Sequence, residues 1–153
     1  HHSCKDMCLI SYESKNDVVD QAIMKLLQAS ESAIMLHSHN AYECEAVIHV
    51  MEKIDQPITM EVNFWNCKLS TKQISTLANV LNSRSRFIQI KGLDLSNNSL
   101  NDSIMADFFS KATSAFGCLE KLFLRSCDIG AKGMGAIVNA LAKSSCRSIT
   151  QFN

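Results

Sequence analysis

A glycine-rich run at residues 130–135, Gly-Ala-Lys-Gly-Met-Gly, is the stretch that most resembles a chemical site. A glycine-rich turn between a strand and a helix can bind phosphate through free backbone N–H groups. This spacing matches neither the dinucleotide fingerprint nor the phosphate loop, which requires Gly-Lys followed by Ser or Thr. Gly130 instead falls where a helix is expected to begin, and Gly133 where a small residue allows helix and strand to pack closely. We therefore predict no cofactor.

Histidines and cysteines are the next residues with possible chemistry. His37 and His39 lie two residues apart, and Cys4 and Cys8 lie four apart. A structural zinc site usually combines two close pairs of matching spacing, which these residues lack. We predict no metal site.

Catalysis by a cysteine or by paired acids is also not expected. A nucleophilic cysteine needs a histidine within hydrogen-bond reach. Cys67 and Cys127 are expected to point inward, whereas the internal histidines lie earlier in the chain. The acids Glu43 and Glu45 are expected on a solvated helix surface. The sequence therefore favours a protein that is not an enzyme.

The composition is that of a globular domain. The chain has 153 residues, 46% of them hydrophobic, and it carries 15 basic and 15 acidic residues. This balance gives no charge that would attract nucleic acid or an anionic membrane. No apolar run approaches the roughly 18 residues that a membrane-spanning helix needs, so no membrane insertion is expected. The seven cysteines lie mostly within apolar patterns, as free thiols do, and favour a cytoplasmic location.

A repeated pattern of apolar residues runs through the chain. Its clearest unit extends from Ile90 to Leu100, with Leu93, Leu95 and Asn98 between them. The same positions recur 29 residues later as Leu119, Leu122, Leu124, Cys127 and Ile129, and 31 residues earlier as Thr59, Val62, Phe64, Cys67 and Leu69. Three units in one phase predict a structural repeat.

Each unit predicts a short strand followed by a turn. Leu93 and Leu95 point to one face of a strand, which should be the buried face. The Asn98 side chain can bond backbone groups that lose their ladder partners where the chain bends. Cys67 and Cys127 can fill the same narrow position with weaker hydrogen bonds.

A helix is expected after each turn. Ser70, Asn101 and Gly130 follow the three units and are favoured N-caps, and Ser70 with Gln73 forms a possible capping box. Apolar residues then recur at helical spacing. They are Ile74, Leu77, Val80 and Leu81, then Met105, Phe108, Phe109 and Ala112, then Met134, Ile137, Ala140 and Leu141. The middle unit should carry about two extra residues in its helix or loop.

Two weaker units precede these three. In one, Ile34 and Leu36 fit the strand positions, His39 or Asn40 would stand at the bend, and a helix would follow. In the other, a strand at 7–9 would precede a helix at 18–27. We predict a single domain of about five repeats, at 4–30, 31–57, 58–88, 89–117 and 118–147, with a further repeat beginning at 148–153. Because both ends lack polar caps, the chain is expected to be a fragment of a longer protein, with the remainder of its parent chain at both ends.

The pattern Leu-x-x-Leu-x-Leu-x-x-Asn/Cys-x-Leu, followed by a helix, resembles the leucine-rich repeat. Its period of 28 to 31 residues and its alternation of Asn and Cys resemble the ribonuclease-inhibitor-like subtype. This resemblance implies an α/β horseshoe-shaped solenoid with parallel strands on the concave face and helices on the convex face. The irregular early repeats most resemble the carboxy-terminal repeat region of NACHT-containing NOD-like receptors.

The side chains between the buried strand residues should face the concave side, where they form three rows. The rows are Glu61, Gly92 and Lys121, then Asn63, Asp94 and Phe123, then Trp65, Ser96 and Arg125. Met35 and His37 would extend the last two rows. Trp65, Phe123 and Arg125 are of the types that dominate binding hot spots. Alternatively, Trp65 covers a loop edge or packs on a neighbouring strand.

These features favour a non-catalytic protein-recognition module. By resemblance, it would be the ligand-sensing or autoinhibitory segment of an intracellular innate immune receptor. The alternative is a regulator of an enzyme on the same scaffold, either GTPase-activating or ribonuclease-inhibitor-like. The expected partner is a protein or ligand on the concave face, because the fold alone does not determine what is bound.

Overall fold

The structure is a computed structural model that describes residues 7–11, 33–38, 40–144 and 151–152. Within these residues, six parallel strands form one sheet whose spatial order is the order of the chain. They are β1 (Met7–Ser11), β2 (Ala33–His37), β3 (Ile58–Asn63), β4 (Ile88–Asp94), β5 (Lys121–Phe123) and β6 (Gln151–Phe152).

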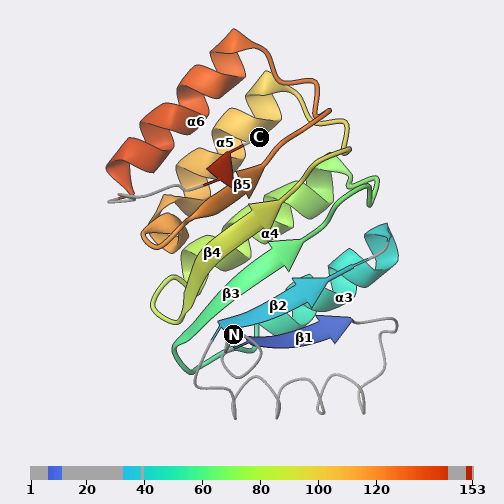
Figure 1. Cartoon of the computed structure of the whole chain (residues 1–153), viewed down its shortest axis with the longest axis vertical. Helices are drawn as coiled ribbons and strands as arrows, with labels where there is room; N and C mark the ends of the chain where they lie inside the picture. Colours follow the sequence, from blue (N-terminus) through green and yellow to red (C-terminus); the bar gives the residue numbers. More distant parts are fainter. Residues whose placement is uncertain (1–6, 12–32, 39, 145–150, 153) are drawn as a thin grey trace.

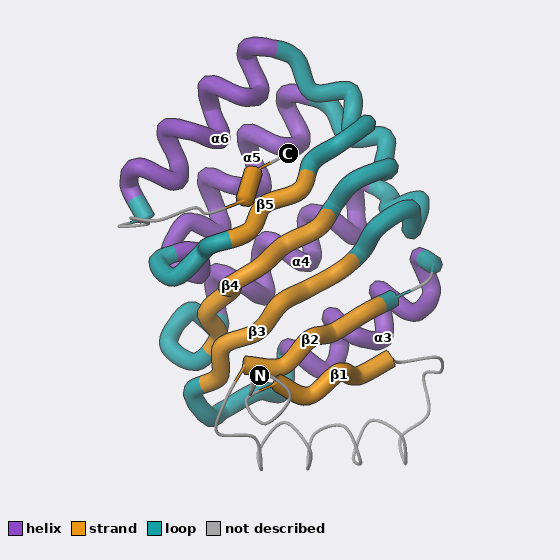
Figure 2. Tube along the Cα trace, in the orientation of Figure 1, coloured by secondary structure: helices purple, strands orange, loops and turns teal. Residues whose placement is uncertain are grey.

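The described helices all lie on one side of this sheet (Figures 1 and 2). They are α3 (Ala41–Met51), α4 (Thr71–Ser83), α5 (Asp102–Ala112), the short 3₁₀ helix η1 (Thr113–Phe116) and α6 (Ala131–Lys143). Neighbouring helices pack on one another in chain order. The result is a mixed α/β fold with a parallel sheet, compatible with the expected repeat. We call the face of the sheet away from the helices the front face.

The predicted inward positions of the strands and helices form the hydrophobic core between the two layers. The buried strand and strand-end residues include Val62, Phe64, Leu93, Leu95, Leu119, Leu122 and Leu124. The buried helix residues include Ile74, Leu77, Val80, Leu81, Met105, Phe108, Phe109, Ala112, Ile137, Ala140 and Leu141. Met134 is only partly buried. The period-2 and helical patterns of the sequence are therefore confirmed.

The predicted helix starts are also confirmed. Ser70 and Gln73 form a reciprocal capping box, and Asn101 accepts a hydrogen bond from the Ile104 N–H. Gly130 caps α6 without a side chain, and its N–H donates to Asp102 Oδ1 at 2.7 Å. The Asp102 side chain at the start of α5 thus accepts a hydrogen bond from the backbone at the start of α6.

Gly133 allows a close approach, as expected, but the neighbour is not a strand. A Cβ added at Gly133 would lie 2.5 Å from Asp102 Oδ1 and 2.8 Å from a methyl carbon of Ile129. The close contact therefore joins α6 to the start of α5. The extra residues of the middle unit form η1, where buried Phe116 packs with its ring centroid 5.3 Å from that of Phe109.

The first apolar position of the unit at 58–88 was predicted wrongly. Ile90 pairs with Met60, not with Thr59, because the register shifts between Met60 and Glu61. An irregularity of this kind adds one residue to one strand of a pair. It explains why Ile90 and Leu93 are both buried although they lie three residues apart.

The register of the unit at 31–57 also differs from the expectation. Leu36 pairs with Val62, so Met35 and His37 lie beside Glu61 and Asn63, one row earlier than predicted. The physical reason is a shorter connection. Four residues lead from Leu36 to the α3 cap Asn40, whereas eight lead from Val62 to the α4 cap Ser70.

The connection ends at Asn40, one of the two residues predicted at the bend. Asn40 instead caps α3, where its side chain accepts a hydrogen bond from the Glu43 N–H. His39 and the predicted helix at 18–27 lie outside the described residues.

Candidate binding surface on the front face

The front face carries three rows of residues from β3, β4 and β5. In the first two rows, Glu61, Gly92 and Lys121 lie side by side, as do Asn63, Asp94 and Phe123. The ladder continues beyond the strands through bonds from Asn66 N to Ser96 O, 2.9 Å, and from Asn97 N to Arg125 O, 2.8 Å. These bonds place Trp65, Ser96 and Arg125 in the third row.

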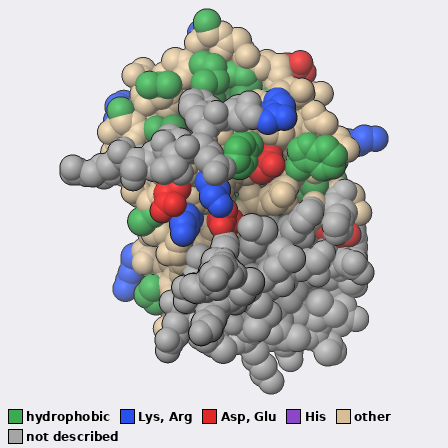
Figure 3. Space-filling model, viewed as in Figure 1, with side chains coloured by type: hydrophobic (Ala, Val, Ile, Leu, Met, Phe, Trp, Pro, Cys, Tyr) green, Lys and Arg blue, Asp and Glu red, His purple; other side chains and the backbone are tan. Residues whose placement is uncertain are grey.

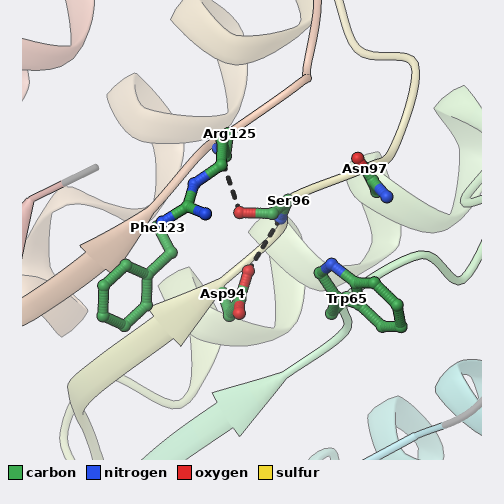
Figure 4. A pocket seen from close by; sticks show the side chains of 6 residues that line it. All are labelled: Trp65, Asp94, Ser96, Asn97, Phe123 and Arg125. Atoms are coloured by element: carbon green, nitrogen blue, oxygen red, sulfur yellow. Dashed lines mark hydrogen bonds between the residues drawn. The ribbon is translucent and has the colours of Figure 1, made fainter.

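A hollow of about 420 Å³ lies over the ends of these three strands (Figure 4). It is lined by Trp65, Asp94, Ser96, Asn97, Phe123 and Arg125. Trp65 borders it on one side and Phe123 on the other, with Asp94 between them. Figure 3 shows that hydrophobic, basic and acidic side chains lie close together on the visible part of this face. The hollow thus offers both apolar area and charge.

Two residues of the second row each accept a hydrogen bond from the backbone just beyond the end of their strand. Asn63 Oδ1 accepts a hydrogen bond from the Trp65 N–H, and Asp94 Oδ1 accepts one from the Ser96 N–H, both at 2.9 Å. Asn and Asp favour such turns because their side chains reach the backbone two residues ahead. These bonds fix the backbone that carries Trp65.

Phe123 occupies the equivalent position on β5 but has no acceptor to offer. The Arg125 N–H instead donates to Ser96 Oγ, at 2.9 Å, across the neighbouring turn. Ser96 therefore satisfies a backbone group of the next unit, and its side chain is not available to a partner in the way the sequence suggested.

The residues of the predicted rows differ in how much of their surface is exposed to solvent. Trp65 is 50% exposed and Arg125 is exposed, whereas Glu61 and Ser96 are only 7% and 5% exposed. The expectation that every residue of the rows is open to a partner is therefore wrong for Glu61 and Ser96. The alternation of strand residues gives the face on which a side chain lies, but its burial depends on the adjacent strands.

Glu61 is buried because it lies across Gly92. A Cβ at Gly92 would stand 2.7 Å from Glu61 Oε1, and the same oxygen lies 3.2 Å from Lys121 Nζ. The missing side chain on β4 therefore leaves room for an ion pair between β3 and β5. An acid, a glycine and a base in one row are the sequence signal for this arrangement.

The turn after β4 is built around Asn98, which is completely buried. Its Oδ1 accepts from the Leu69 N–H at 3.0 Å, and its Nδ2 donates to Phe64 O and Leu95 O at 2.9 and 2.8 Å. A further contact joins Nδ2 to Ser96 O at 3.2 Å. The predicted role of Asn98 in satisfying backbone groups is confirmed, and it extends to the preceding unit.

Each turn contains a residue with left-handed backbone next to the third row. Asn66, Asn97 and Ser126 have φ of 54°, 59° and 56°. Asn enters this region more readily than most residues. The kink places Asn97 at the rim of the hollow.

The cysteines at the Asn98 position make fewer bonds. Cys67 Sγ lies 3.3 Å from Ser38 O, and Cys127 Sγ lies 3.1 Å from Leu95 O. A hydrogen bond from Cys44 lowers the pKa of Cys67, and the same bond, together with burial, raises the pKa of Cys44. Burial raises the pKa of Cys127. These thiols therefore stand in different electrostatic surroundings.

Glu43 is not on a solvated helix surface as predicted. It is 7% exposed, and its carboxylate lies 3.5 Å from Asn40 Nδ2 at the start of α3. Among the described residues, no three His, Cys, Asp or Glu side chains are grouped as metal ligands. Within the same ranges, no helix has the length and apolar character needed to cross a membrane.

Comparison with known families gives one match. The family model for the Leucine Rich Repeat matches residues 89–111, which contain most of β4, the Asn98 turn and nearly all of α5. No curated protein and no solved structure shows a significant match. The match supports a leucine-rich repeat protein, and this motif suggests a module for protein–protein interaction.

Proposed function

We propose that the chain is a leucine-rich repeat solenoid whose front face is concave and binds a protein partner without catalysing a reaction. The main observation that supports this proposal is the position of Trp65, which is half exposed at the rim of a polar and aromatic hollow. Tryptophan is enriched in binding hot spots, and here it borders a hollow that also contains an aromatic ring and charged groups.

The backbone around Trp65 supports this proposal. Asn63 and the ladder bond from Asn66 to Ser96 hold both sides of the residue. A surface that is already ordered loses little conformational entropy on binding. Tryptophan is one of the three residue types that are enriched in binding hot spots.

The finer assignment is a ribonuclease-inhibitor-like repeat segment of a cytoplasmic NOD-like receptor, acting in ligand sensing or autoinhibition. It is supported by the repeat length, by the alternation of Asn98 with Cys67 and Cys127, and by the free thiols at Cys44 and Cys118. A phosphate-loop ATPase domain encoded in the same gene product would favour this receptor. Stimulation of a GTPase or inhibition of a ribonuclease by the chain would favour an enzyme regulator instead.

The general proposal is tested by Trp65→Ala, with Val138→Ala as a matched control. Val138 is similarly exposed, at 55%, but lies on α6. Proteins retained from a cell extract by each variant would be quantified, and binding of the purified partner then measured by calorimetry. We expect Trp65→Ala to weaken binding about 30-fold, the size of a hot-spot loss of roughly 2 kcal/mol, and Val138→Ala to leave it unchanged. Equal binding by the Trp65 variant and the native chain would reject the front face as the binding surface.

A further inference from the structure

We propose that the front face recognises a basic side chain, a lysine or an arginine of the partner, which inserts between Trp65 and Phe123 and pairs with Asp94. This inference rests on the proposed function, because it names the chemistry by which that surface selects its partner.

The Asp94 carboxylate is fixed but not neutralised. Its Oδ1 accepts the Ser96 N–H at 2.9 Å, and no other hydrogen bond or ion pair of this carboxylate occurs within the described part of the chain. The other acid of the rows, Glu61, is already paired with Lys121 at 3.2 Å. Of the two acids in the described rows, Asp94 is therefore the one that can accept a charge-assisted hydrogen bond from a partner.

The aromatic residues on both sides of Asp94 suit a long basic side chain. Figure 4 shows the Asp94 carboxylate between the ring of Phe123, at the end of β5, and that of Trp65, just after the end of β3. The aliphatic part of a lysine or arginine can pack on these rings while its charged end reaches the carboxylate. A cation near the face of an indole ring is further stabilised by the ring quadrupole.

The size of the hollow agrees with such a guest. Its volume of about 420 Å³ leaves room for a lysine or arginine side chain, and the hollow is open to solvent on one side. The Arg125 side chain occupies the Phe123 side of the hollow. We therefore place the entering side chain on the Trp65 side of Asp94.

The inference is tested with a displayed library of random peptides panned against the native chain. Enriched peptides would be synthesised, together with versions in which lysine or arginine is replaced by glutamine. Calorimetry would give their affinities for the native chain, for Asp94→Asn and for Trp65→Ala. Trp65 is the single tryptophan of the chain, so a change in its fluorescence reports whether a peptide binds at this hollow.

We expect the enriched peptides to share a basic residue and to lose at least about 10-fold in affinity when that residue becomes glutamine, as is usual for a charge-assisted bond. Asp94→Asn should cause a similar loss, and the two changes together should cost little more than either alone. Asparagine keeps the Oδ1 acceptor for the Ser96 N–H, so this variant removes charge but not the turn. The change in the peptide needs no altered protein and gives an independent result.

The outcomes separate the inference from the proposed function. Peptides that lack a basic residue, or that carry an acidic one in its place, yet still depend on Trp65, would overturn the inference and leave the recognition surface intact. Absence of enrichment, or peptides that bind Trp65→Ala and the native chain equally, would reject both.

Discussion

The turn after β4 and the turn after β5 follow strands that pair in register, but they satisfy their backbone groups differently. In the turn after β4, the Asp94 side chain accepts the Ser96 N–H. Asn98 accepts the Leu69 N–H and donates to the carbonyl oxygens of Phe64 and Leu95. The second has Phe123 and Cys127 at the same positions, and Cys127 makes its closest contact with Leu95 O. The polar side chains of one turn thus serve both itself and its neighbours.

This difference shows that the turns are not independent copies. Asn98 bonds Phe64 O and Leu69 N of the preceding unit, and Ser96 accepts the Arg125 N–H of the following one. The turn after β4 therefore holds three units together. A change there should be felt on both sides, whereas a change at Cys127 after β5 should reach only the preceding unit, through Leu95 O.

The largest effect is expected for Asn98→Ala. It leaves the buried Leu69 N–H and the Phe64 carbonyl without their side-chain partner, and leaves Leu95 O with only the Cys127 thiol. We expect a total cost of about 3 kcal/mol in the free energy of unfolding. Urea unfolding measures this cost. The exposed neighbour Ser99, changed to Ala, is the control and should lose little. A loss below about 1 kcal/mol for Asn98→Ala would contradict the central role of this turn.

An intermediate effect is expected for Asn98→Cys, which gives the turn after β4 the residue that the turn after β5 already has. A thiol can donate to Phe64 O but is a weak acceptor for the Leu69 N–H, so we expect a loss of about 2 kcal/mol. The reverse change, Cys127→Asn, should not recover an equal gain, since the Leu100 N–H already donates to Asn98 O at 2.8 Å. Effects of equal size and opposite sign in urea unfolding would mean that the two turns are equivalent after all.

The smallest effect is expected for Ser96→Ala, which removes the acceptor of the Arg125 N–H and should cost about 1 kcal/mol. Phe123→Asn supplies that turn with its own acceptor, as Asn63 does on β3. In the Phe123→Asn background, the cost of Ser96→Ala should therefore fall close to zero. Thermal unfolding of the four chains of this cycle gives the coupling directly. Full additivity would show that Ser96 does not serve the turn after β5.

The sequence predicted the parts of the fold that depend on nearby residues. Ser70, Asn101 and Gly130 cap their helices, and Leu93 and Leu95 are buried, because N-caps and strand alternation are local properties. Asn98 could be assigned to its turn for the same reason.

The sequence did not predict features that depend on the adjacent strand. The irregular pairing at Met60 and the earlier position of His37 arise from the lengths of connections on both strands. The surroundings of Glu61 and Ser96 depend on groups far away in the sequence. Lys121 Nζ lies 60 residues after Glu61, and the Arg125 backbone N–H lies 29 residues after Ser96. Within the candidate site, the rows could be predicted, but not which of their members remain exposed.

The ion pair that passes over Gly92 has a consequence for how this surface can diverge. Substitution at position 92 would have to displace the Glu61 carboxylate, and Lys121 would then lose its partner. Related chains should therefore vary at these three positions together. Where position 92 has a larger residue, position 61 should have a shorter or uncharged one, and position 121 should no longer need a base. In an alignment of related chains, this arrangement should therefore appear as correlated substitution at three positions on three strands, and not as one invariant residue.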